Sequence, residues 1–345
     1  MVTWNNLDTL TSYAKLKDLK NHVDIKEAMA GENGAKRVAE YSAPMASGLS
    51  FNYAAKQVDD EVLDVLAELA DEHQLVDKFE ELYNGAIINT GEQRLVLHHL
   101  ARRQLGKDVI VDGVNKRDFY VEQQKKAADF ANKVHAGEIT NEAGEKFTTV
   151  VQIGIGGSDL GPRAMYIALE NWAKKNNTFK MEAKFISNVD PDDASAILAS
   201  IDVAHSLFIL VSKSGTTLET LTNESFVKDA LKKAGLNPAR HMIAVTSETS
   251  PLAKSSDYLD AFFMDDYIGG RFSSRCILSG RRPGTFTSGR TVLFRCPGYK
   301  PFPHNDVPAP ALNTVHHTSE YAGQSLRSAV QSTFLPFVPS HSPAF

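Results

Sequence analysis

Residues 207–220 read Leu-Phe-Ile-Leu-Val-Ser-Lys-Ser-Gly-Thr-Thr-Leu-Glu-Thr, and the rest of the chain is best understood outward from this stretch. The apolar run 207–211 predicts a buried parallel strand, and the residues after it, up to 233, have helical character. A strand, a hydroxyl-rich turn and a helix in this order make an anion site in α/β folds. The first N–H groups of the helix lack intrahelical acceptors, and the helix dipole makes that end positive. We therefore expect a phosphate group at this turn.

The side chains of the turn suit a phosphate. Lys213 adds a compact positive charge, and Gly215 lets the backbone approach a ligand closely. Hydroxyl donors come from Ser212, Ser214, Thr216 and Thr217. An ordinary helix start capped by serine or threonine is the alternative that this stretch alone leaves open.

Beyond residue 115, predicted strands and helices alternate. Strands are expected at 148–155, 183–188, 207–211, 242–246 and 261–264. Helices are expected at 118–136, 161–175, 192–200, 217–234 and 250–256, and Gly137 can close the first of them with a positive φ. This alternation predicts an α/β fold with a doubly wound parallel sheet, whose ligands lie beyond the carboxyl ends of the strands.

Residues 1–115 are predicted to be mostly helical. Apolar residues with helical spacing predict two core stripes, one at Val62, Leu66 and Leu69 and one at Leu75, Phe79 and Leu82. His98 and His99 follow in a further turn and helix. Because adjacent helical residues point away from each other, packing or surface roles are favoured for both over a shared metal site.

The composition is that of an ordinary globular protein. The 345 residues are 42% hydrophobic and 23% charged, and the net charge of −5 disfavours nucleic acid as the main partner. No apolar stretch approaches the ~20 residues needed to cross a bilayer, so we expect no membrane association and a cytosolic protein. Cys276 and Cys296 provide neither a disulfide framework nor a C-x-x-C spacing, so we expect chemistry without a metal.

Residues 275–345 differ from the rest of the chain. They hold nine of the 14 prolines, with 7 Lys+Arg and 2 Asp+Glu, so a body of net charge −10 is followed by a tail of +5. Each proline removes a backbone donor and restricts the residue before it, and we find no periodic apolar face there. We expect this tail to be disordered, and a reading-frame or gene-model change near Ser274 would account for it.

Two further motifs follow predicted strands. Residues 153–162 read Ile-Gly-Ile-Gly-Gly-Ser-Asp-Leu-Gly-Pro, whose adjacent glycines let a sugar or phosphate touch backbone N–H groups. A dinucleotide fingerprint starting at Gly154 would need glycine where Asp159 stands, which disfavours a nicotinamide cofactor, although Asp190 could pass for its ribose-binding acid. Residues 265–274 read Asp-Asp-Tyr-Ile-Gly-Gly-Arg-Phe-Ser-Ser, and two glycines before Arg271 indicate a tight turn that presents a planar cation to an anionic ligand.

Together the three motifs resemble the glucose-6-phosphate isomerase family in order and spacing, and residues 89–98 resemble its N-terminal segment. The resemblance covers roughly residues 1–274. It implies a helical N-terminal region over 1–115 and one three-layer α/β/α sugar-isomerase domain over 116–274, with the family's second such domain absent. It also implies a cytosolic homodimer that needs no cofactor and interconverts two phosphosugars, glucose 6-phosphate and fructose 6-phosphate, through a cis-enediol.

The resemblance also implies roles for individual residues. It places the phosphate on the turn of Ser212, Lys213, Ser214, Gly215, Thr216 and Thr217, and the sugar along Gly157 and Ser158. Arg271 would stabilise the enediolate, since a fixed guanidinium aimed at developing negative charge is worth on the order of 10²–10³ in rate. Glu219 would be a supporting acid in the cavity, and a first-turn glutamate favoured by the helix dipole is an equal alternative.

The tail matches none of the family's later motifs. There the family has a glutamate that shuttles the proton, a histidine that helps to open the ring and a late lysine. The residues of suitable type here, which no motif surrounds, are His304, His316, His317, His341 and Glu320. A general base must come within about 3 Å of its proton. Two interpretations follow: an isomerase that is truncated and inactive as written, or a non-catalytic phosphosugar-binding or regulatory module.

Overall fold

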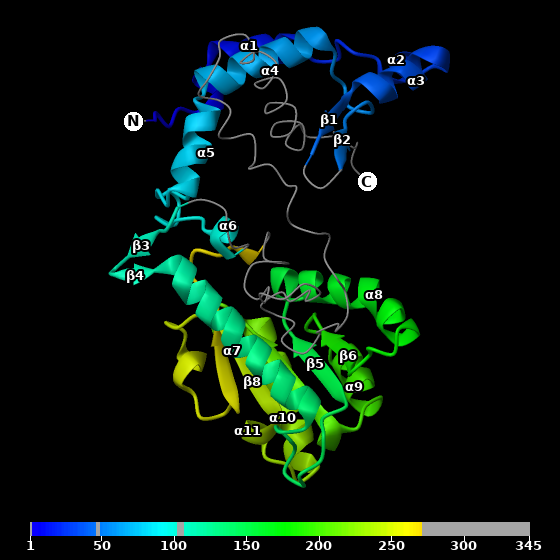
Figure 1. Ribbon diagram of the computed structural model, residues 1–345, viewed down its shortest axis with the longest axis vertical. Helices are drawn as coiled ribbons and strands as arrows, with labels where there is room; N and C mark the ends of the chain where they lie inside the picture. The colour runs from blue at the N-terminus through cyan, green and yellow to red at the C-terminus, as the bar shows by residue number, and fades with distance from the viewer. Residues whose placement is uncertain (1, 46–48, 102–106, 271–345) are drawn as a thin grey trace. The chain divides into compact units, whose positions relative to one another are not determined.

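The computed structural model describes residues 2–45, 49–101 and 107–270. The predicted tail 275–345 and Arg271 lie outside the described residues. The described chain divides into two compact units, one up to residue 80 and one from residue 81 onward, and Figure 1 labels many of the elements of both. The sequence had placed the end of the helical region at residue 115.

The first unit is mainly helical. Its elements are η1 (Leu7–Thr9), α1 (Thr11–Asp18), α2 (Ile25–Ala28), α3 (Gly31–Glu40), α4 (Asp60–Glu72), the start of α5 (Leu75–Tyr83), and the antiparallel pair β1 (Ser42–Pro44) and β2 (Ser50–Asn52). The side chain of Asp59 caps α4 by accepting the N–H of Val62 at 3.0 Å. The predicted core stripe of α4 is confirmed, because Val62, Leu66 and Leu69 are all buried.

The second predicted stripe is wrong at Phe79, which is 43% exposed. The buried residue of α5 is its neighbour Lys78, whose ammonium lies 4.8 Å from the centre of the Trp4 ring. A lysine can occupy this position because its long aliphatic stem packs like an apolar side chain. The prediction of a helix was therefore right, but the face of α5 that points inward is shifted by one residue from the predicted face.

The second unit is built on a five-stranded parallel sheet. Its strands are β5 (Thr149–Ile153), β6 (Glu182–Ile186), β7 (Ser206–Val211), β8 (Met242–Thr246) and β9 (Asp260–Phe263), in the order β6-β5-β7-β8-β9. All five predicted strands are confirmed. The central one is β7, with Phe208 opposite Val151 of β5 and Met242 of β8.

Of the helices predicted at 118–136, 161–175, 192–200, 217–234 and 250–256, all but the last are confirmed, and the structure adds short elements that were not predicted. The helices and short elements of this unit are α6 (His98–Ala101), α7 (Lys116–Ala136), α8 (Leu160–Lys175), α9 (Pro191–Ala199), α10 (Leu218–Lys233), α11 (Pro238–His241), β3 (Ile110–Val111), β4 (Val114–Asn115), η3 (Gly156–Ser158), η4 (Val203–His205) and η5 (Pro251–Lys254). Gly137 closes α7 with a φ of 80°. The expected helix over 250–256 is instead the 3-10 turn η5, a tighter winding that suits so short a segment between two extended residues, Ser250 and Ser255.

Helices cover both faces of the sheet, which confirms the three-layer architecture (Figure 1). Alternate residues of a strand point to opposite faces. Ile209 of β7 belongs to the core that α7 closes with Phe130. Leu210 belongs to the opposite core, which α10 closes with Val227 and Leu231. The side chains of α8 join the first of these cores and those of α9 the second.

The strand order reverses between β5 and β7. The chain passes from β5 to β6 on one side and then crosses to β7 on the other. In doubly wound sheets the crevice beyond the carboxyl ends of the strands at such a reversal is where ligands bind. The two loops at this point are 154–159, after β5, and 212–217, after β7.

None of the helices among the described residues has the length and apolar character that a bilayer-spanning segment needs.

Because β7 is buried, the stability of the second unit should be sensitive to the shortening of side chains on this strand. Leu210 is 0% exposed, so Leu210→Ala should lower the free energy of unfolding by about 2–5 kcal/mol, through lost burial and the cavity left behind. Leu218, which is 75% exposed, is the matched control, and Leu218→Ala should change it by less than about 0.5 kcal/mol. Urea unfolding followed by circular dichroism measures both, and equal effects would contradict the assigned packing.

A histidine near the start of β7 predicts a pH dependence. His205 Nδ1 lies 2.7 Å from Asp202 Oδ2, and its Nε2 lies 3.0 Å from Glu145 Oε2. The hydrogen bond to Asp202, with the charges of both carboxylates, raises the pKa of His205. This stabilisation is complete below the unfolded pKa of about 6.5 and is lost as pH rises through the higher folded pKa. Urea midpoints should therefore fall more between pH 6 and 8.5 for the wild type than for His205→Gln, and parallel profiles would refute this.

Candidate functional site

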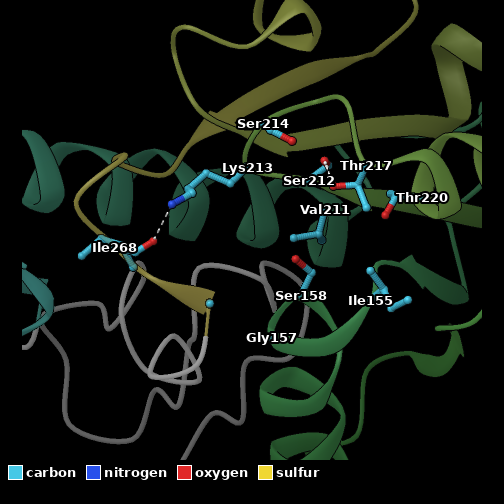
Figure 2. A pocket seen from close by; sticks show the side chains of 11 residues that line it. Ile155, Gly157, Ser158, Val211, Ser212, Lys213, Ser214, Thr217, Thr220 and Ile268 are labelled. Atoms are coloured by element: carbon cyan, nitrogen blue, oxygen red, sulfur yellow. Dashed lines mark hydrogen bonds between the residues drawn. The ribbon is translucent and has the colours of Figure 1, made fainter. Parts of the chain in front are cut away.

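A pocket lies at the carboxyl edge of the sheet, where β5 and β7 end (Figure 2). Its volume is about 270 Å³, just under the range of about 300–1,000 Å³ usual for small-molecule sites. The described residues that line it are Ile155, Gly157, Ser158, Val211, Ser212, Lys213, Ser214, Thr217, Thr220, Ile268 and Gly270. The three segments that the sequence singled out therefore meet at one place.

The loop after β7 is folded by its own hydroxyl groups. Ser212, which is buried, donates through Oγ to Thr217 Oγ1 at 3.3 Å and accepts the N–H of Gly215 at 3.1 Å. Gly215 has a φ of 67°, and a Cβ there would lie 2.1 Å from Ser250 Oγ. The position therefore needs glycine both for its backbone conformation and for space.

The loop ends at the start of α10, which presents open backbone donors. Thr217 is the N-cap residue, and its side chain makes no capping hydrogen bond to the helix. The first backbone bond across this end runs from the N–H of Leu221 to the carbonyl of Thr217, at 3.0 Å. The N–H groups before Leu221 and the positive end of the helix dipole form an arrangement that binds anions.

Lys213 is the one cationic residue among the described residues that line the pocket. Its Nζ lies 3.3 Å from the carbonyl oxygen of Asp266. It also lies 3.4 Å from the carbonyl oxygen of Ile268, a contact drawn as a dashed line in Figure 2. The lysine therefore links the loop after β7 to the turn that precedes Arg271. It also brings a positive charge to the side of the pocket where that turn lies.

The loop after β5 is held by backbone contacts. A Cβ on Gly157 would lie 2.3 Å from the carbonyl oxygen of Gly270, so the two chain segments touch through their main chains. The side-chain amide of Gln152 in β5 donates to the carbonyl oxygen of Ser158 at 2.7 Å. Beside it, burial raises the pKa of Asp159, opposed by an ion pair with Arg163 at 3.1 Å.

His98 fixes the turn at Gly269. Its Nε2 lies 2.9 Å from the backbone nitrogen of Gly269 and 3.0 Å from the carbonyl oxygen of the same residue. His99 contacts Tyr83 instead, with its Nε2 at 3.1 Å from the carbonyl oxygen and the two rings stacked. The expectation that the adjacent histidines point to different surroundings is confirmed. The contact with the turn before Arg271 was not predicted.

The predicted site residues fall into three groups. Those that line the pocket are Gly157, Ser158, Ser212, Lys213, Ser214 and Thr217. Gly215 shapes the loop from behind it, and Thr216 is exposed and bonded to Ser214 Oγ. Glu219 is exposed in the first turn of α10 and does not line the pocket, a position that suits a dipole-stabilising glutamate. Arg271 follows Gly270 and lies outside the described residues.

Sequence reasoning gave no site role to five lining residues: Ile155, Val211, Thr220, Ile268 and Gly270. Three of them are apolar and carry no chemical signature. Thr220 could have been found, because it lies three residues after Thr217 and so shares its face of α10.

The family model described as phosphoglucose isomerase matches residues 52–279. The chain belongs to the phosphoglucose isomerase family. The match includes both glycine-containing loops and the turn at Gly269, which are the segments that form the pocket.

Relatives of known name support this membership. The chain is 56% identical over 278 residues to "Glucose-6-phosphate isomerase" of Treponema denticola, covering 79% of this chain and 52% of the relative. It is 43% identical over 277 residues to the protein of the same name from Borreliella afzelii, covering 79% and 51%. The chain thus spans about half the length of the curated relatives it matches.

A solved structure supports the fold. The crystal structure of a glucose-6-phosphate isomerase from Chlamydia trachomatis superimposes with a TM-score of 0.66 at 34% identity. The superposition covers 78% of this chain and 50% of that one. The fold predicted from the resemblance is therefore confirmed for the described residues.

The contact between the two glycines predicts an effect of substitution on stability. Gly157→Ala should lower the free energy of unfolding by about 1–3 kcal/mol, because the backbone of Gly270 cannot move aside as a side chain would. Gly91→Ala is the control, since a Cβ at Gly91 would meet only Asn89 Oδ1, at 3.7 Å. Urea unfolding tests both, and an unchanged midpoint for Gly157→Ala would refute the close approach.

Proposed function

We propose that this chain binds a hexose 6-phosphate, with the phosphate on the loop 212–217 and the sugar along Gly157 and Ser158. The observation that carries the proposal is the open N-terminus of α10 at the strand-order reversal, surrounded by hydroxyl groups and Lys213. Phosphate is the anion that such a helix end accommodates best, because N–H groups, hydroxyls and an ammonium all donate to its oxygens.

Membership of the phosphoglucose isomerase family supports glucose 6-phosphate and fructose 6-phosphate as the ligands. Their interconversion moves a proton between C2 and C1 and builds negative charge on the neighbouring oxygens. In this proposal Arg271, which directly follows the pocket residue Gly270, stabilises that charge.

The lining of the pocket supports binding without catalysis by this chain. None of the described residues that line it is an aspartate, a glutamate or a histidine. Proton transfer between two carbons needs such a group within about 3 Å of the proton. We therefore propose that the chain as written binds the phosphosugar without isomerising it. The same observation favours the second interpretation, a phosphosugar-binding module.

The first prediction of this proposal concerns affinity. Lys213→Ala and Thr217→Ala should each weaken binding of fructose 6-phosphate by about tenfold to hundredfold, as expected for hydrogen bonds to a charged group. Isothermal titration calorimetry on the full chain measures this. Thr222→Ala is the control, because the Thr222 hydroxyl donates to the carbonyl of Leu218 on the same helix and does not line the pocket. Failure of the wild type to bind would refute the proposal.

The second prediction concerns turnover. A coupled assay that follows the conversion of fructose 6-phosphate to glucose 6-phosphate should stay at the rate of the blank, since the described pocket holds no acid–base group. Sustained turnover by the purified chain, abolished by Arg271→Ala, would contradict binding without catalysis. It would show that residues outside the described ones complete the site.

A further inference from the structure

Thr220 has a buried hydroxyl that the structure leaves without a partner. The residue is 2% exposed, and its Oγ1 makes no hydrogen bond to any described residue. It also lines the pocket, from the inner wall formed by the first turn of α10. Because burial removes a hydroxyl from water, an unpaired one costs its free energy of desolvation, and such groups normally have a partner.

The usual partner of a helical threonine is unused here. A threonine inside a helix commonly donates to the carbonyl four residues earlier, and Thr222 does so to Leu218 at 2.9 Å. Thr220 makes no such bond to a described residue. In Figure 2 its oxygen is directed into the space between α10 and the loop that carries Ile155 and Ser158.

The surroundings of this hydroxyl match a phosphate oxygen. Thr220 is the third residue of α10, so its own backbone N–H is one of the open donors at the positive helix end. Thr217, one turn earlier on the same face, also lines the pocket and shares a hydrogen bond with Ser212. A fully ionised phosphate only accepts hydrogen bonds, and Thr220 offers two donors to it.

The apolar neighbours strengthen the case. Ile155 and Val211 line the same pocket, and Val211 is 0% exposed. A wall of this kind excludes water from the Thr220 hydroxyl and increases the electrostatic strength of a hydrogen bond formed there. A ligand oxygen that reaches this depth therefore gains more from the hydroxyl than one bound at the open rim, where Ser214 is exposed.

We propose that Thr220 is a further phosphate ligand: its hydroxyl donates to an oxygen of the phosphate bound at the N-terminus of α10. The inference rests on the proposed binding of a phosphosugar and adds one residue, to which the sequence analysis gave no role. With Thr220 as a ligand, the phosphate group contacts the inner wall of the pocket in addition to the loop 212–217.

The test removes the hydroxyl and keeps the shape. Thr220→Val should weaken binding of both fructose 6-phosphate and inorganic phosphate by about tenfold to hundredfold, a ratio that corresponds to about 1.4–2.8 kcal/mol. Without ligand, its melting temperature should equal or exceed that of the wild type, because an unpaired buried polar group has been removed. Thr220→Ser should bind within about threefold of the wild type, since it retains the donor. Thr222→Val, on the same helix, should leave both affinities unchanged.

Each other outcome decides against a part of the inference. If the wild type binds both ligands and Thr220→Val binds them with the same affinities, the role of Thr220 is overturned while the proposed function stands. Weaker binding of fructose 6-phosphate with unchanged binding of inorganic phosphate would overturn the assignment to the phosphate. A lowered melting temperature without ligand would assign the hydroxyl a structural role instead. If the wild type binds neither ligand, the proposed function fails and this inference fails with it.

Discussion

The pocket depends on one constraint: the N-terminus of α10 must stand open at the edge of the sheet. Its backbone N–H groups provide an anion site only if no side chain caps them and if the helix is rigidly held. Thr217 leaves them uncapped, and Val227 and Leu231 anchor the helix in the core beneath the sheet. Gly215 reverses the chain tightly enough for β7 to lead directly into that helix end. β7 therefore holds the helix end rigidly, and α10 provides the positive end of the dipole that attracts an anion.

Long-range contacts then bring two distant segments to this helix end. Gly157 meets Gly270 through the main chain, Lys213 contacts two carbonyl oxygens of the turn at 266–268, and His98 contacts the backbone of Gly269. These contacts join residues that are far apart in the sequence. They position the turn that precedes Arg271 by several independent bonds, so that the loss of one leaves the others in place.

The parts of the fold that were predictable are those decided locally. Five strands, the helix boundaries and the phosphate-type loop 212–217 follow from apolar runs, capping residues and glycines within a few positions of one another. What could not be predicted depends on partners distant in the sequence. The period of α5 does not reveal that Lys78 is buried and Phe79 exposed, and nothing near His98 indicates Gly269 as its partner. Thr220 is an intermediate case, because its helical face was readable but its unpaired hydroxyl was not.

The contact between Gly157 and Gly270 has a consequence for how ligand preference can evolve in this pocket. Where a side chain lines a wall, substitution can widen or narrow the cavity by one methylene at a time. Here that wall is backbone against backbone, with space for no Cβ on Gly157. Substitution of Gly157 therefore cannot narrow the pocket without displacing the backbone of Gly270, and selectivity among ligands of different size is tuned more readily from the other side, by the residues of β7 and α10.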